Sequence, residues 1–132
     1  MASAAETVPN TPFHLLGGHD TFQAIVDRFY DLMDSDPAYA ELRAMHAEDL
    51  SRMRVELTRF LTGWAGGPRD WFDANPGRCM MSVHKPYAIS QIVADQWADA
   101  MTRAIAEVAP ARSDLAGQLT QLLGDMARGM GR

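Results

Sequence analysis

The chain has 132 residues, of which 47% are hydrophobic, and this length suits a single domain around one core. Lysine and arginine number 12 against 17 aspartates and glutamates, which gives a net charge of -5 with no basic stripe, so nucleic acid is not an expected partner. No run reaches the roughly 18 apolar residues of a membrane span, and the first twelve residues lack the pattern of a signal peptide. We therefore expect a cytoplasmic protein with no membrane partner.

The N-terminal residues 1–12 contain two prolines and no apolar period, so we predict a flexible arm followed by one domain over 13–132. After Gly17 and Gly18, either Asp20 or Thr21 is placed to cap a first helix. Its apolar positions recur three and four residues apart and are Phe22, Ile25, Val26, Phe29, Leu32 and Met33. This spacing predicts one buried helical face.

Three further helices follow from the same periodicity. Pro37 restarts the chain for a short helix through Leu42, with a break near His46. A second long helix runs over 49–64, a long irregular loop with at most a short helical piece covers 69–80, and a third long helix follows Pro86 and reaches Val108. The apolar residues of the fourth are Leu115, Leu119, Leu122 and Met126. The pattern predicts an all-α fold whose helix pairs cross at an angle.

The candidate ligands for a metal are sparse. The histidines at 14, 19, 46 and 84 form no zinc-type array, and the single cysteine, Cys79, excludes both a disulfide framework and a cysteine-rich metal site. One histidine is enough, however, where a porphyrin supplies four nitrogens to iron, and His84 is placed for that part just before a helix. Taken alone, a histidine in a loop usually has a structural role. Aromatic residues at helical core spacing, such as Tyr30 and Trp97, are usually packed in the hydrophobic core.

Three segments carry a family resemblance that covers about residues 13–108. They are "FHLLGGHDTFQAIVDRFYDLM", "HAEDLSRMRVELTRFLTGWAGGP" and "HKPYAISQIVADQWADAM", and a tryptophan stands thirteen residues after His84. Together they resemble the truncated haemoglobins, and most of all the second group of that family. The resemblance implies a two-over-two sandwich of helices around one haem b, with His84 as the iron ligand and Tyr30, His46 and Trp97 on the distal side. It also places Leu57 and Phe60 against the haem face.

Two places depart from the family pattern. Met53 stands where the family usually has a small residue, and we interpret it as a gate or packing residue in preference to a sixth iron ligand. His46 as a sixth ligand is likewise the less favoured alternative. The run before His84 lacks the arginines suited to haem propionates, so Arg78, Lys85 and Ser82 are candidate replacements, with a solvated surface role equally open. Tyr87 completes the candidate cofactor contacts, and an inert Cys79 thiol is favoured over a reactive one.

The resemblance implies binding of O2 and related diatomics at a pentacoordinate or weakly hexacoordinate iron. Oxygen on a ferrous haem gains negative charge, so the Tyr30 O–H, the His46 imidazole N–H and the Trp97 indole N–H are expected to donate hydrogen bonds to it and to hold it tightly. Such a pocket suits sensing, redox chemistry or NO detoxification better than bulk oxygen transport. NO dioxygenase and peroxidase-like activities are the candidate reactions, NO, CO and H2O2 the further ligands, and an unidentified reductase the partner. The alternatives are a haem-based sensor or carrier that works with a separate protein and, least favoured, a haem-free helical interaction module. The chain is expected to be a monomer or homodimer.

Overall fold

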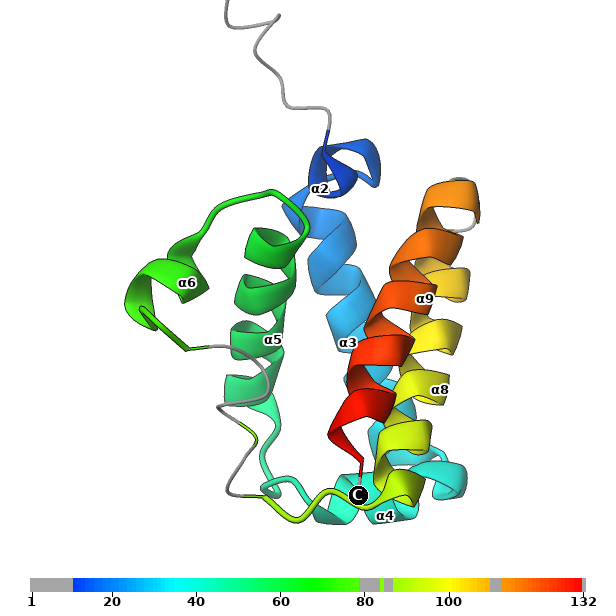
Figure 1. Ribbon diagram of the computed structural model, residues 1–132. Helices are drawn as coiled ribbons and strands as arrows, with labels where there is room; N and C mark the ends of the chain where they lie inside the picture. The colour runs from blue at the N-terminus through cyan, green and yellow to red at the C-terminus, as the bar shows by residue number, and fades with distance from the viewer. Residues whose placement is uncertain (1–10, 79–83, 85–86, 110–112, 132) are drawn as a thin grey trace, which may run out of the picture.

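The computed structural model describes residues 11–78, 84, 87–109 and 113–131. Within these ranges the chain is helical, without strands (Figure 1). The elements in chain order are α2 (Pro12–Leu15), α3 (His19–Ser35), η1 (Pro37–Tyr39), α4 (Ala40–Ala44), α5 (Ser51–Trp64), α6 (Asp70–Ala74), α8 (Gln91–Val108) and α9 (Ser113–Met130). None of the described helices has the length and apolar character needed to cross a bilayer.

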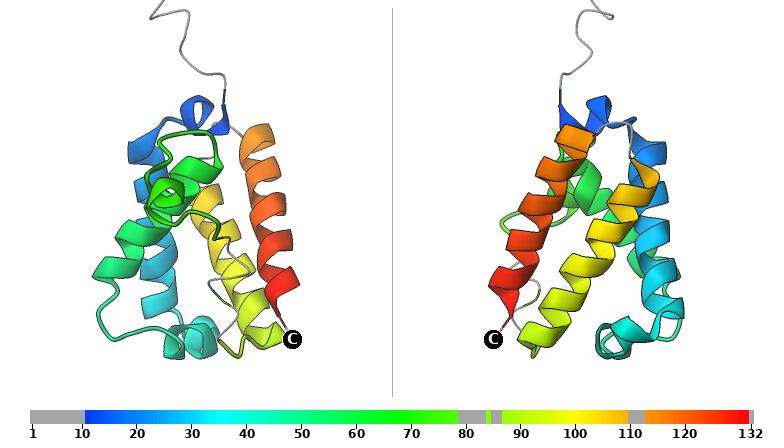
Figure 2. Two further views of the ribbon diagram at one scale, coloured as in Figure 1. Left: turned by 60° about the vertical axis from the view of Figure 1, so that its left-hand side comes forward. Right: turned by 90° about the vertical axis from the view of Figure 1, so that its right-hand side faces the viewer.

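Four long helices form two pairs. Helix α3 packs against α5 and against α8, and α8 packs along α9. Figure 2 shows α8 and α9 side by side and running in opposite directions, with α3 on the far side of α8. The short helix α6 lies outside this arrangement, against α5 (Figure 1). The predicted all-α, two-over-two sandwich is therefore confirmed.

The first long helix forms because its apolar residues share one face. The side chains of Phe22, Ile25, Val26, Phe29 and Met33 are all at most 1% exposed, so one stripe of α3 supplies much of the core. The predicted cap was wrong, since neither Asp20 nor Thr21 caps α3. Gly18 is the N-cap, at φ 77° and ψ -158° and without a side-chain hydrogen bond. Only glycine adopts this backbone readily, so the double glycine sets the start of the helix.

The segment between α3 and α5 agrees with the prediction that a new helix begins at Pro37 and that helical structure is interrupted near His46. Pro37 opens η1, and α4 then continues to Ala44, two residues beyond the predicted end at Leu42. Helix α5 begins at Ser51, where the Asp49 carboxylate accepts hydrogen bonds from the Ser51 N–H and hydroxyl, at 2.9 and 2.7 Å. The non-helical stretch between the two helices carries His46.

Several helix boundaries differ from the prediction. Thr11 and Pro12, assigned to the arm, are instead the cap and first residue of α2, because the Thr11 hydroxyl accepts from the His14 N–H and Pro12 suits a first helical turn. The rest of the predicted arm lies outside the described residues. Helix α8 begins at Gln91, capped by the Ser90 hydroxyl, and α9 extends past Met126 to Met130.

The hydrogen bonds of Asp36 make the free energy of unfolding depend on pH in the acid range. Its carboxylate accepts hydrogen bonds from the Ala38 N–H at 2.9 Å and from Arg103 at 2.8 Å, and both bonds hold its pKa below the ordinary value. The unfolded chain binds this proton first, so the contribution of Asp36 is complete above about pH 4 and is lost as pH falls through the lower pKa of the folded state.

We expect the urea midpoint of wild type to fall between about pH 4 and pH 3, and that of Asp36→Asn to fall less over the same interval. Glu48→Gln, a substitution of an exposed connector residue, is the control and should keep the wild-type slope. Equal acid slopes in wild type and Asp36→Asn would contradict this assignment.

Candidate functional site

Tyr30 is a buried side chain whose hydroxyl has no hydrogen-bond partner among the described residues. Its side chain is 2% exposed, and its ring contacts Phe29, with centroids 4.9 Å apart, and His46, at 6.0 Å. The hydroxyl makes no hydrogen bond to any residue that the structure describes, yet every fully sealed side-chain nitrogen or oxygen among those residues has a partner. The Tyr30 hydroxyl must therefore border open space. Burial raises its pKa, against a smaller opposing effect of Arg54, so the group stays protonated and can donate.

Trp97 reaches the same place from α8. Its side chain is half-buried, and its ring lies 5.1 Å from that of Phe29 between centroids. Phe29 therefore touches both Tyr30 and Trp97 and holds them in one aromatic cluster where α3 crosses α8. No hydrogen bond to the described part of the chain engages the Trp97 indole N–H. Sequence reasoning treated Phe29 only as a core residue, and its helical spacing contains no signal for this second role.

His46 lies in the connector after α4, and its hydrogen bond decides which ring nitrogen carries a proton. Its Nδ1 is 2.9 Å from the Leu42 carbonyl oxygen, and since a carbonyl only accepts, Nδ1 must be the donor. Burial lowers the pKa of His46, and the charges of Arg43 and His84 lower it further against the raising effect of the Leu42 bond. The neutral ring therefore leaves Nε2 without a hydrogen. The prediction that a His46 N–H donates to the distal ligand does not agree with this geometry.

His84 lies near His46 although 38 positions separate them in the sequence. The two are close enough for a positive charge on His84 to be the smallest of the causes that act on the pKa of His46. His84 is half-buried, its ring is 6.3 Å from that of Tyr87 between centroids, and its carbonyl accepts from the Tyr87 N–H at 2.9 Å. The Tyr87 side chain is itself 55% exposed. The predicted iron ligand and the three predicted distal residues thus come from four segments of the chain.

The apolar candidates on α5 lie at different depths. Phe60 is buried, and its ring packs on those of Trp71 and Phe72, with centroids 5.2 and 5.5 Å away. Leu57 is half-buried one turn earlier, and Met53 is 38% exposed two turns before Phe60. Several further apolar side chains are only partly covered where they meet the core, and sequence reasoning assigned none of them to the site: Phe72, Ile89 and Met126.

Arg54 is another neighbour of the site that sequence reasoning missed. It donates to the carboxylates of Asp27 at 3.2 Å and Asp31 at 2.8 Å, and its guanidinium carbon lies 5.8 Å from the Tyr30 ring centroid. Arg54 therefore ties α5 to α3 beside Tyr30. The two aspartates are four residues apart on one helix face, but nothing in the sequence pairs them with an arginine far along the chain.

The predicted propionate anchors are only partly within the described ranges. Arg78 is exposed at the end of the loop that follows α6. The other members of this stretch lie outside the described residues: Cys79, Met80, Met81, Ser82, Val83 and Lys85. The anchoring roles of Arg78 and Lys85 therefore stay predictions.

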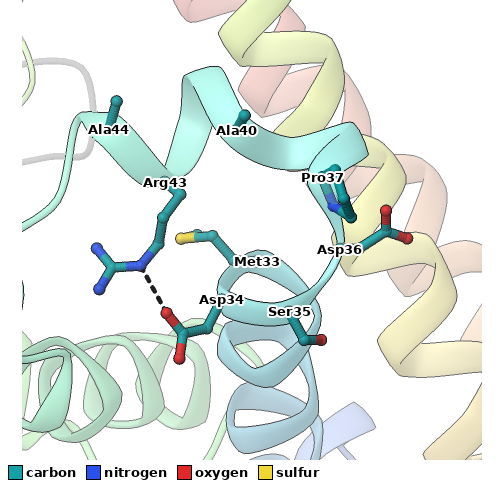
Figure 3. A pocket seen from close by; sticks show the side chains of 8 residues that line it. All are labelled: Met33, Asp34, Ser35, Asp36, Pro37, Ala40, Arg43 and Ala44. Atoms are coloured by element: carbon teal, nitrogen blue, oxygen red, sulfur yellow. Dashed lines mark hydrogen bonds and ion pairs between the residues drawn. The ribbon is translucent and has the colours of Figure 1, made fainter.

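A surface hollow of about 370 Å³ lies between the end of α3 and the start of α4 (Figure 3). Its lining residues are Met33, Asp34, Ser35, Asp36, Pro37, Ala40, Arg43 and Ala44. It is open to solvent and shares no residue with the cluster of Tyr30, Trp97 and Phe29. The hollow therefore flanks the connector that carries His46 and is separate from the candidate site.

The residues present fit haem better than a bare metal ion. No group of three or more histidine, cysteine, aspartate or glutamate side chains within the described ranges can hold a metal. A single histidine is sufficient where the cofactor brings four nitrogens, and partly covered apolar side chains are what a flat hydrophobic ring buries. The uncommitted Tyr30 hydroxyl and the partly covered apolar side chains Leu57, Phe72 and Ile89 agree with that cofactor.

Comparison with known proteins places the chain in a family. The model of the family described as bacterial-like globin matches residues 11–130. The group 2 truncated hemoglobin YjbI of Bacillus subtilis (strain 168) is 27% identical over 99 residues, which are 75% of this chain and 72% of that protein.

Two solved structures extend the likeness to the whole fold. A cold-adapted truncated hemoglobin of Pseudoalteromonas haloplanktis TAC125 is 32% identical, with a TM-score of 0.87 over 93% of this chain and 98% of that one. A group II 2-on-2 hemoglobin of Agrobacterium tumefaciens is 28% identical, with a TM-score of 0.89 over 96% and 97%. The chain therefore belongs to the bacterial-like globin family as a truncated 2-on-2 haemoglobin of the group II type, a haem-iron protein that binds O2 and related gases.

Proposed function

We propose that His84 holds the haem iron and that Tyr30 and Trp97 hold the gas ligand by donating hydrogen bonds to it. The observation that carries this proposal is the hydroxyl of the buried Tyr30 side chain, which is protonated, has no partner among the described residues and borders open space. Trp97 supports it, because its ring packs on the same Phe29 ring as Tyr30 and its indole N–H is likewise uncommitted within the described chain. Two uncommitted donors then flank one aromatic ring, and we propose that both reach the gas.

Bound haem supplies a redox-active iron on which dioxygen takes up negative charge. The Tyr30 O–H and Trp97 N–H stabilise that charge, and they do so strongly where Phe29, Leu57 and other apolar side chains keep water away. A protein that retains dioxygen in this way releases it slowly. Retention favours redox chemistry over bulk oxygen transport.

The reaction that this site supports best is NO dioxygenation. Nitric oxide and dioxygen combine with one electron to give nitrate, NO + O2 + e⁻ → NO3⁻, and the electron comes from a separate reductase. The chain contributes by keeping dioxygen in place until nitric oxide arrives. Met53, which is 38% exposed on α5 and which the resemblance places on the distal side, is the proposed gate on the route of entry.

We expect the purified haem protein, given oxygen and a reducing system, to consume NO and to form nitrate in equal amounts. An anaerobic sample is the control and should form no nitrate, because the reaction takes both oxygen atoms from O2. Nitrate production at the level of free haem would refute NO dioxygenation. Slow oxygen release in that same sample would then favour the carrier or sensor alternative.

A further inference from the structure

Arg43 on α4 joins three acceptors that surround the segment of His46. Its Nε donates to the Asp34 carboxylate at 2.9 Å, a contact drawn in Figure 3. Its Nη1 donates to the Ala47 carbonyl at 2.9 Å and its Nη2 to the Glu48 carbonyl at 2.8 Å. The guanidinium therefore connects the end of α3 to the backbone that directly follows His46.

Arg43 supplies the side-chain hydrogen bonds to the backbone of this segment within the described residues. Residues 47–49 are exposed, and Arg43 is the side chain that satisfies the carbonyls of Ala47 and Glu48 within the described chain. A planar guanidinium presents its donors in a rigid fork, so three bonds at once define the path of the backbone, which a single flexible cation does not achieve. The Arg43 side chain is 24% exposed, and this partial burial protects the contacts from screening.

A second anchor lies on the other side of His46. The Leu42 N–H donates to the Gln96 side-chain oxygen at 2.9 Å, and the Gln96 amide donates to Glu41 at 2.8 Å. The carbonyl of the same Leu42 accepts the Nδ1–H of His46. Gln96 precedes Trp97 on α8, so the helix that carries the indole also holds the residue that orients the imidazole.

We propose that Arg43 is a positioning residue for His46: it holds the connector so that the Leu42 carbonyl keeps the Nδ1–H of His46, and Nε2 faces the distal site as a hydrogen-bond acceptor. The proposal rests on the proposed function only in taking the space beside Tyr30 as the gas site. A bare Nε2 disfavours the negative charge that dioxygen takes up. Release of the connector lets the ring adopt the opposite tautomer, whose Nε2–H donates to the gas and slows its release.

The direct test reads the tautomer of His46. Protein labelled with 15N-histidine is prepared in the ferrous CO form, and long-range 15N–1H spectra are compared for wild type, Arg43→Ala and Arg28→Ala. Arg28 is the matched control, because its Nε donates to Glu107 at 2.9 Å between α3 and α8, outside the connector. We expect His46 to show a protonated Nδ1 in wild type and Arg28→Ala, and a mixture of tautomers in Arg43→Ala. A wild-type spectrum in Arg43→Ala overturns the proposal.

The functional readout separates positioning from general loosening of the fold. Arg43→Ala is expected to slow oxygen release by about two- to tenfold, the effect of one added neutral hydrogen bond, while CO release stays near wild type. In the His46→Phe background the same substitution should have no effect on oxygen release. An unchanged or faster oxygen release, or an equal effect in both backgrounds, overturns the proposal.

A second variant covers the case in which Arg43→Ala does not fold, and spectra without haem cover the case in which none binds. Arg43→Lys keeps the positive charge but lacks the planar fork that bonds both carbonyls at once, so it replaces Arg43→Ala if that variant does not fold, with a smaller shift toward the second tautomer expected. A wild-type tautomer in Arg43→Lys then overturns the proposal. If the wild-type protein takes up no haem, the proposed function fails, and the tautomer spectra of the protein as purified still decide whether Arg43 orients His46.

Discussion

Replacing His84 with glycine is expected to abolish stable haem binding, so that the purified variant lacks the Soret band of the wild-type protein. Among the described residues of the candidate site, Tyr30 stays protonated and is a poor iron ligand. The bond from Nδ1–H of His46 to Leu42 leaves its Nε2 able to bind iron, but the resemblance places His46 on the distal side, where it does not replace the proximal ligand. Losing residues that merely support a metal ligand typically costs 10- to 100-fold in affinity, so loss of the ligand itself should cost more than about 100-fold.

The measurement is a haem titration followed by absorbance, with and without added imidazole. Glycine leaves room for a free imidazole, which should restore part of the band if the lost group was an iron ligand. His19→Ala is the matched control, because it removes a histidine whose side chain is 63% exposed at the start of α3. Wild-type spectra and haem affinity in His84→Gly would show that another residue is the ligand.

Trp97→Phe and Tyr30→Phe are each expected to accelerate oxygen release by about ten- to a hundredfold. Each substitution removes one donor and keeps an aromatic ring against Phe29, so the packing at the crossing of α3 and α8 is largely retained. A hydrogen bond to a charged partner in a dry site contributes about 1 to 3 kcal/mol, and that range corresponds to the expected change in rate.

Stopped-flow oxygen release provides the measurement, and CO release provides an internal comparison because CO takes up little negative charge. Tyr39→Phe is the matched control, since Tyr39 is also buried but its hydroxyl already donates to Asp99 at 2.5 Å and accepts from Arg103 at 3.0 Å. It should leave oxygen release unchanged. Rates equal to wild type in Trp97→Phe and Tyr30→Phe would remove both side chains from ligand stabilisation.

The helices were predictable where their periodicity is long and their ends carry strong signals. Spacing predicted the buried face of α3 from Phe22 to Met33. The backbone chemistry of proline predicted that a new helix begins at Pro37. The cap at Gly18 was not found, because an aspartate and a threonine followed it and the usual preference pointed to them. Helix α2 was missed, because four residues are too few to show a period.

The candidate site was predictable as a set of residue types and positions, through the family pattern that surrounds His84 and Trp97. Its internal contacts were not. The prediction gave His46 an imidazole donor, whereas the bond to the Leu42 carbonyl commits that donor to the backbone. No local pattern predicts this bond, because it depends on how the connector is held by Arg43 and by Gln96, which comes from another helix.

The sequence by itself determined the all-α class, the approximate span of each long helix and the family, because these depend on local propensity, on the period of apolar residues and on motifs read in order. Only the tertiary structure decided that Phe29 joins Tyr30 to Trp97, that His46 and His84 interact, and that Arg43 spans three acceptors. Those facts depend on how α3, α8 and the connector approach one another. Hydrogen bonds and ring contacts act over a few ångströms, so they exist only after packing has brought distant residues together.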